Sequence, residues 1–187
     1  MASSEFGRGF YDAGALRQIA TNLFYGWGYN FYRAENQLRA DDQLVRSRAA
    51  GLLSQATDAV NGAESAYRRE HLPPPSRSKP FPDAEAVAAA QGLERLARAI
   101  GALSAAIQHQ AAPENDRMTQ RYREEAATLQ TLIQSDERLA GQCELLRSMV
   151  QGQDGAAILA RMADLEAGLE AIRETLQRRE AVLMGRG

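Results

Sequence analysis

From residue 16 onward, apolar residues recur at steps of three or four along the chain. This spacing is typical of an amphipathic α-helix, because residues three and four apart lie on one helix face. The first series is interrupted once, at Asp41 and Asp42, and comprises Leu16, Ala20, Leu23, Trp27, Phe31, Ala34, Leu38, Val45, Ala49, Leu52, Ala56, Ala59, Ala63 and Tyr67. We therefore predict one long aromatic-rich helix, or two helices, over residues 13–71.

Glycine and proline mark where this helical region breaks and ends. Gly26, Gly28 and Gly51 are the candidate weak points, since glycine destabilises a helix interior. Residues 72–82 hold five of the six prolines, which lack the N–H that a helix requires, so they are predicted to form a linker. Residues 1–12 show no helical period and are expected to form an N-terminal arm, with Asp12 capping the helix that follows.

Residues 83–187 repeat the helical pattern three times and are expected to form an antiparallel three-helix bundle, packed with residues 13–71 as one domain. Asp83 and Asp154 are the predicted N-caps of the first and last of these helices. The last helix shows its seven-residue repeat without a slip. The three apolar stripes are Leu93, Leu96, Ile100, Leu103 and Ile107; Met118, Tyr122, Glu125, Leu129, Leu132, Asp136, Leu139, Cys143, Leu146 and Val150; and Ile158, Met162, Leu165, Leu169, Ile172, Leu176, Arg179 and Leu183.

The composition agrees with this pattern. The 187 residues include 34 Ala and 20 Leu, against 17 β-branched residues, a ratio that favours helix over strand. The predicted fold class is all-α: an elongated antiparallel bundle of four long helices, the first either continuous or broken, with coiled-coil-like packing.

Charged residues interrupt two of the stripes. Folding the last two helices into a hairpin brings Arg179 within one turn of Glu125, so we hypothesise a structural ion pair between them that sets the helix register. The alternative is that both long side chains extend to solvent. Asp136 is too short to reach solvent easily, and it either faces a cationic group or marks the edge of its stripe.

Nine of the twelve aromatic residues lie within the first 32 positions. On a helix, Phe24, Trp27 and Phe31 share the core-facing side, while Tyr25, Tyr29 and Tyr32 form a separate stripe. The tyrosines either cover a second core layer packed by Phe6, Phe10 and Tyr11, or form a docking surface for a protein. Aromatic side chains are enriched at binding hot spots. The predicted partner-binding residues are Tyr25, Trp27, Tyr29, Tyr32 and Arg33.

Two other uses of these rings are weaker hypotheses. A membrane-interface anchor would require a basic polar face that the segment lacks. Stacking of single-stranded nucleic acid is disfavoured by the net charge of −2. Of the 22 basic residues only Lys79 is lysine, and the planar guanidinium of arginine suits contacts with carboxylates at protein interfaces.

The chain shows no arrangement of residues typical of catalysis or metal binding. His71 and His109 lack partners at metal-ligand spacing and are expected at helix C-termini. Cys143 lies on an apolar stripe and is interpreted as a small buried hydrophobic residue. Glycine-rich phosphate loops and nucleophile elbows do not occur in the sequence. We expect no metal, no cofactor and no enzymatic activity.

These observations lead to the hypothesis of a cytoplasmic adaptor, assembly factor or structural subunit that binds a protein partner or a larger complex. The single cysteine fits a reducing compartment, and neither a secretory signal nor a run of about 18 apolar residues occurs. The heptads of the last helix also permit a homo-oligomer. The main alternative is a helical-bundle carrier of a small apolar ligand or cofactor in an aromatic-lined cavity. A third class is a protein that coats a lipid or polymer body.

Overall fold

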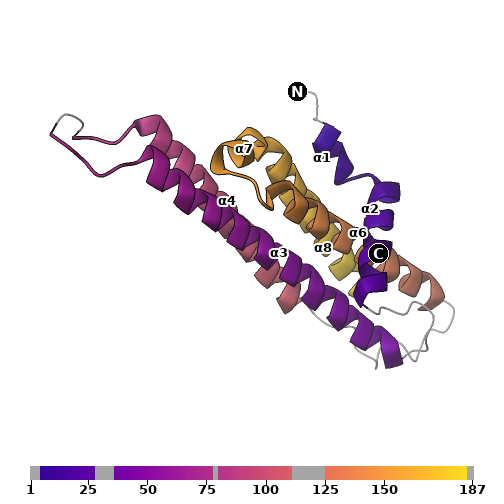
Figure 1. Cartoon of the computed structure of the whole chain (residues 1–187). Coiled ribbons are helices and arrows are strands. Elements are labelled where there is room, and N and C mark those ends of the chain that lie inside the picture. The colour runs from indigo at the N-terminus through magenta and orange to yellow at the C-terminus, as the bar shows by residue number, and fades with distance from the viewer. Residues whose placement is uncertain (1–4, 28–35, 78–79, 111–124, 185–187) are drawn as a thin grey trace.

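The computed structural model describes residues 5–27, 36–77, 80–110 and 125–184 (Figure 1). This part of the chain is all-α and contains no strand. Its helices are α1 (Glu5–Gly9), α2 (Ala13–Trp27), α3 (Asn36–His71), α4 (Ala84–His109), α6 (Glu125–Val150), α7 (Gly155–Ala160) and α8 (Met162–Leu183). The predicted fold class, an elongated helical bundle, is confirmed.

Three aspartates cap helices at the predicted positions. The Asp12 carboxylate accepts hydrogen bonds from the backbone N–H groups of Gly14 and Ala15, at 2.9 and 3.0 Å. Asp83 accepts one from Glu85 N–H at 2.8 Å, and Asp154 accepts one from Ala157 N–H at 2.8 Å. Each cap satisfies backbone donors that have no partner within the helix. The starts of these three helices, α2, α4 and α7, were therefore predicted correctly from the sequence.

The long helices form two antiparallel hairpins that lie side by side (Figure 1). In the first, α3 packs along α4, and Ser104 Oγ donates a hydrogen bond to the Ala50 carbonyl at 2.9 Å. In the second, α6 packs against α8, and Thr175 Oγ1 donates to Gln142 Oε1 at 2.9 Å. Helices α3 and α6 contact each other and join the two hairpins. These two helices run in the same direction, and so do their antiparallel partners α4 and α8.

The predicted stripes form the core. The buried side chains include Val45, Ala49, Leu52 and Ala56 of α3, Leu93, Leu96, Ile100, Leu103 and Ile107 of α4, Leu132, Leu139, Cys143, Leu146 and Val150 of α6, and Ile158, Leu165, Leu169, Ile172 and Leu176 of α7 and α8. These residues come from all four stripes. Burial of one apolar face per helix is the main stabilising contribution to such a bundle.

The structure differs from the predicted elements in two places, and at Gly51 it decides a point that the sequence left open. The segment expected as an arm contains the short helix α1, and Phe10 after it is fully buried. The last predicted helix is divided at Arg161, whose φ of −105° and ψ of 13° separate α7 from α8, although its apolar stripe continues across the break. Helix α3 runs through Gly51 without interruption. Residues 28–35, between α2 and α3, lie outside the described part.

Candidate functional site: the exposed end of helix α2

Helix α2 lies across α6 and is held there by close backbone packing (Figure 1). At Gly141 of α6, a Cβ atom would lie only 2.6 Å from the Leu16 carbonyl oxygen, so the lack of a side chain lets the helices meet. Arg17 Nε donates to Glu137 Oε2 at 3.1 Å on the outer side of the contact. These contacts hold α2 on a rigid support.

At the C-terminal end of α2, neighbouring aromatic residues point in opposite directions. Phe24 is 1% exposed and packs in a small cluster with Ala20, Val45 and Ala140. Trp27 is half-buried against the same cluster, with its ring centroid 5.6 Å from that of Phe24. Tyr25 is 91% exposed. The predicted separation of a core-facing Phe24 from an outward-facing Tyr25 is confirmed.

The other predicted docking residues cannot be placed with these two. Tyr29, Tyr32 and Arg33 lie outside the described residues, as does Phe31. Of the predicted docking residues the structure thus describes Tyr25 and Trp27, which lie at the same end of α2: Tyr25 is exposed, and Trp27 packs against the core.

The alternative was that the tyrosines form a second core layer, packed by aromatic residues of the N-terminal arm. Tyr25 is exposed and does not belong to such a layer. Phe10 is buried against Gly168 of α8, where an added Cβ would lie 2.5 Å from its ring. Tyr11 is half exposed; burial raises the pKa of its hydroxyl, and the nearby carboxylates of Glu174 and Glu170 add to that rise. Phe10 thus packs against α8, and Tyr11 lies near Glu170 and Glu174 of the same helix.

A buried polar cluster lies where the ends of α4, α6 and α8 meet α3. Arg179 is fully buried, and its Nε donates to Asp136 Oδ1 at 3.2 Å, while its Nη1 donates to Gln110 Oε1 at 3.1 Å. Arg46 Nη1 donates to the Gln110 carbonyl at 2.6 Å. Burial lowers the pKa of Arg46, and the Asp136 carboxylate acts in the opposite direction. Asp136 therefore faces cationic groups, which was one of its two predicted roles.

The hypothesised Glu125–Arg179 pair stays a prediction, because the side chain of Glu125 lies outside the described part. Sequence reasoning missed Gln110 and Arg46 in this cluster. Gln110 follows the last residue of α4, beyond the stripe, and Arg46 is a charged residue next to the stripe residue Val45 but not part of the predicted stripe. Neither carries a local signal of burial, because their surroundings come from helices distant in the sequence.

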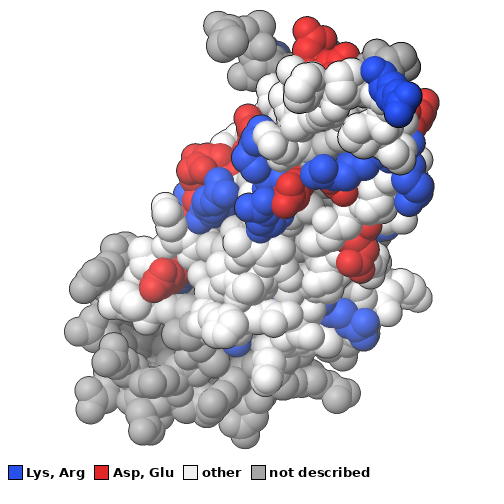
Figure 2. Space-filling model, turned by 90° about the vertical axis from the view of Figure 1, so that its left-hand side faces the viewer, with Lys and Arg blue, Asp and Glu red and all other residues white. Residues whose placement is uncertain are grey.

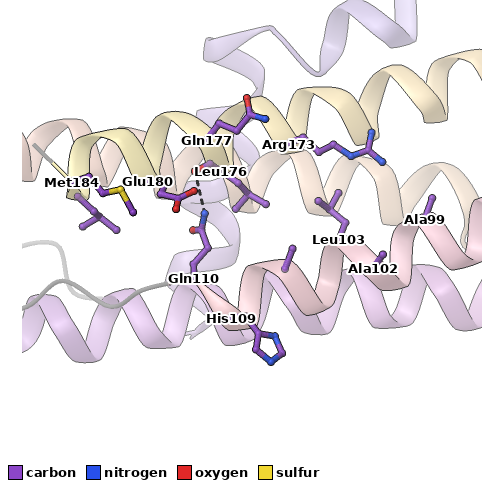
Figure 3. Close-up of a pocket in the computed structure, with 12 residues that line it drawn as sticks. Ala99, Ala102, Leu103, His109, Gln110, Arg173, Leu176, Gln177, Glu180 and Met184 are labelled. Atoms are coloured by element: carbon purple, nitrogen blue, oxygen red, sulfur yellow. Dashed lines mark hydrogen bonds between the residues drawn. The ribbon is translucent and has the colours of Figure 1, made fainter. Parts of the chain in front are cut away.

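A groove of about 640 Å³ separates α4 from α8 (Figure 3). Its walls carry Leu103, Leu176, Leu183 and Met184 together with three alanines, and among the described residues no Phe, Tyr or Trp lines it. Leu103 and Leu176 project from opposite walls, and Gln110 reaches across the groove, with Met184 beyond it, to donate a hydrogen bond to the Leu176 carbonyl at 3.1 Å. The alternative of an aromatic-lined cavity for a carrier does not match this groove.

The described residues outside these sites show no metal-binding cluster and a surface of mixed charge. Within the described residues, no group of three or more His, Cys, Asp or Glu is arranged to hold a metal ion. Cys143 is buried as predicted, and burial raises the pKa of its thiol well above the usual range, with Glu144 adding to the effect. His71 and His109 end α3 and α4. On the face in Figure 2, basic and acidic side chains are intermixed.

Two further findings bear on what the protein could be. Among the helices of the described residues, none combines the length and the apolar character needed to cross a membrane. Comparison of the chain with protein families, curated proteins and solved structures gave no match.

Proposed function

We propose that the protein is a non-enzymatic helical adaptor, assembly factor or structural subunit that docks a protein partner through the end of α2. The observation that carries the proposal is Tyr25, a large aromatic side chain that is 91% exposed next to the fully buried Phe24. Trp27, Tyr29, Tyr32 and Arg33 complete the proposed docking surface. The proposed compartment is the cytoplasm, because the single cysteine fits a reducing environment.

The anchoring of α2 supports this role. Tyrosine offers a large contact area with few rotatable bonds, and a ring on a rigid helix loses little conformational entropy when a partner covers it. Phe24, the Leu16–Gly141 contact and the Arg17–Glu137 ion pair hold the helix in place. A partner would therefore meet a preformed surface.

The proposal is tested by site-specific photo-crosslinking in cells of the source organism. A photoreactive phenylalanine analogue replaces Tyr25 in one variant and Phe81 in another. Phe81 is the matched control because it is also an aromatic residue, 80% exposed, in the proline-rich linker. We expect a discrete protein adduct from position 25 and none from position 81.

Alanine variants complete the test. Tyr25→Ala is expected to weaken co-purification of the crosslinked partner about tenfold or more, the effect of losing a hot-spot residue, with an unchanged thermal midpoint. Phe81→Ala should leave co-purification intact. Equal crosslinking from both positions, or full partner recovery with Tyr25→Ala, would contradict the proposal.

A further inference from the structure

Helices α6 and α8 form another hollow, of about 300 Å³, on a different face of α8 from the α4–α8 groove. Its lining residues on α8 are Thr175, Arg178, Ala181 and Val182, and none of these lines the α4–α8 groove. We call it the α6–α8 hollow. Its volume lies at the lower end of the range of pockets that hold small molecules.

The charge that lines the α6–α8 hollow is of one sign. Arg138 of α6 and Arg178 of α8 line it, and among the described residues no Asp or Glu does so. The α4–α8 groove, by contrast, carries Glu180 as well as Arg173. Because arginine stays protonated at any physiological pH, two guanidinium groups at one small hollow favour the binding of an anion.

Both guanidinium groups have hydrogen-bond donors to spare. Arg138 is partly buried, and it makes no hydrogen bond or ion pair with any other residue that the structure describes. Arg178 contacts only the Glu174 carboxylate, at 3.4 Å, and its side chain is 58% exposed. An exposed ion pair of this kind is weak, and it uses one of the five N–H donors of the guanidinium. An anion in the hollow can therefore accept hydrogen bonds from both arginines.

A neighbouring hollow of about 250 Å³, at the start of α2, shares Gln134 and Arg138 as lining residues with the α6–α8 hollow. These two side chains, one turn apart on α6, therefore lie at the boundary between the hollows. The Gln134 side chain makes no hydrogen bond within the described part of the chain, so its amide N–H groups add donors beside the Arg138 guanidinium. The α6–α8 hollow thus combines two positive charges with a neutral donor.

This donor set suits a phosphate group better than a carboxylate. One guanidinium can satisfy both oxygens of a carboxylate in a single bidentate contact. Two guanidinium groups from different helices match the three oxygens and the charge of nearly −2 that a phosphate monoester carries. Ala181 and Val182 give the hollow an apolar side, which a short carbon chain on the phosphate can contact.

We propose that the α6–α8 hollow binds a small phosphate monoester, with its phosphate between Arg138 and Arg178 and its organic group against Ala181 and Val182. This goes beyond the proposed docking function and does not depend on it. The hollow lies on α6 and α8, whereas Tyr25 lies on α2, so either proposal can fail without the other. A free phosphate ion offers the same charge without the organic group, and the experiment separates the two.

The test is isothermal titration calorimetry of the full chain with propyl phosphate, butyrate and inorganic phosphate. All three are compared at the same low ionic strength, because salt screens exposed charges. Propyl phosphate and butyrate carry the same three-carbon chain on different anionic groups. We expect propyl phosphate to bind about tenfold more tightly than butyrate, through its additional charged hydrogen bonds. It should bind at least about threefold more tightly than inorganic phosphate, through its carbon chain.

The same titration has an expected pH dependence. The second pKa of a phosphate monoester is about 6, whereas both arginines stay charged throughout. Lowering the pH from about 7.5 to about 5.5 converts the dianion to the monoanion, and should therefore weaken the binding of propyl phosphate severalfold. Binding that strengthens at the lower pH would show that the hollow does not select the dianion.

Three variants locate the binding. Arg138→Gln and Arg178→Gln are each expected to weaken the binding of propyl phosphate about tenfold or more, since each removes a charge and its hydrogen bonds. Arg69→Gln is the matched control, because Arg69 is exposed on α3 and does not line the hollow; it should leave binding unchanged. Circular dichroism verifies folding. The exposure of Arg178 keeps the test valid even where Arg138→Gln fails to fold.

Several results would overturn the proposal. The absence of propyl phosphate binding would remove the site, and equal binding of butyrate would remove its selectivity for phosphate. Equal binding of inorganic phosphate would assign the hollow to the free ion. An equal loss of affinity in Arg178→Gln and Arg69→Gln would show that propyl phosphate responds only to the overall charge of the protein.

Discussion

Gly141 and Gly168 allow the N-terminal segment to pack against the bundle. Gly141 admits the backbone of Leu16, and Gly168 lies beneath the ring of Phe10. In addition, Gln142 Nε2 donates to the Phe10 carbonyl at 3.0 Å in a buried position. A residue with any side chain at either glycine would force α1 or α2 away from its support. These contacts therefore determine where the candidate docking surface sits.

Alanine substitutions of two glycines should have opposite effects on stability. Gly141→Ala is expected to lower the free energy of unfolding by roughly 1–3 kcal/mol, because its Cβ would overlap the Leu16 backbone. Gly62→Ala should raise it by up to about 1 kcal/mol, since this α3 position has no atom within 4 Å and alanine favours helix. Urea unfolding followed by circular dichroism measures both. Equal stabilisation would show that α2 does not rest on Gly141.

Cys143 should be unreactive in the native protein. The reactive form of cysteine is the thiolate, and burial raises the pKa of this thiol well above its usual range. Native protein is therefore expected to react with Ellman's reagent far more slowly than the same protein in concentrated urea. The urea-unfolded protein serves as its own control. Rapid stoichiometric labelling in native buffer would place the thiol at the surface.

At the scale of the helices, the Asp136–Arg179 contact joins α6 to α8. Both side chains are buried, and the same guanidinium also contacts Gln110 after α4. Such a contact has demanding geometry, so it favours one register of the hairpin over its neighbours. The sequence indicated polar interruptions at these positions but did not predict the Asp136–Arg179 contact, and the Glu125–Arg179 pair that hairpin counting suggested stays a prediction.

Replacing Asp136 by asparagine should destabilise the bundle strongly. The change keeps the size of the side chain but removes the negative charge beside a buried guanidinium, with an expected loss of roughly 3–5 kcal/mol. Glu170→Gln is the matched control, because Glu170 forms an ion pair with Arg173 at 3.0 Å with both partners exposed. Its expected loss is below about 1 kcal/mol. Urea unfolding measures the free energy of unfolding of both variants. Similar losses in the two would contradict the conclusion that burial makes the Asp136–Arg179 contact important.

Element prediction succeeded where the signal was local. Apolar spacing identified the core faces of α3, α4, α6 and α8, and the aspartates identified helix starts, because both effects act within one or two turns. The break at Arg161 and the helix α1 were missed. The apolar stripe runs through the former without a slip, and the latter is a single short turn with no amphipathic period.

At the scale of the whole molecule, the two hairpins leave the α4–α8 side open. Each helix carries an apolar stripe that predicts a partner, but a stripe does not specify which helix will cover it. Joining the hairpins through α3 and α6 places α4 beside α8 with a groove between them. The groove lined by Leu103 and Leu176 was not foreseen, because its two walls lie 63 or more residues apart in the chain.

The candidate site shows the same division between local and distant information. Helical spacing separated Phe24 from Tyr25 correctly, since opposite faces of a helix follow from the 3.6-residue turn. That α2 rests on α6, and that Phe10 packs against α8, depends on glycines more than 120 residues away from the residues they contact.

The sequence by itself determined that the protein is helical, where three of the helices begin, and which residues of the apolar stripes face the core. Those properties follow from backbone hydrogen bonding and from the three-to-four-residue spacing of apolar side chains. Only the tertiary structure decided that Arg179 meets Asp136 and Gln110, that Tyr25 stands exposed on an anchored helix, and that a groove lies between α4 and α8. Apolar stripes are interchangeable, and the choice among partners is made by packing between residues far apart in the chain.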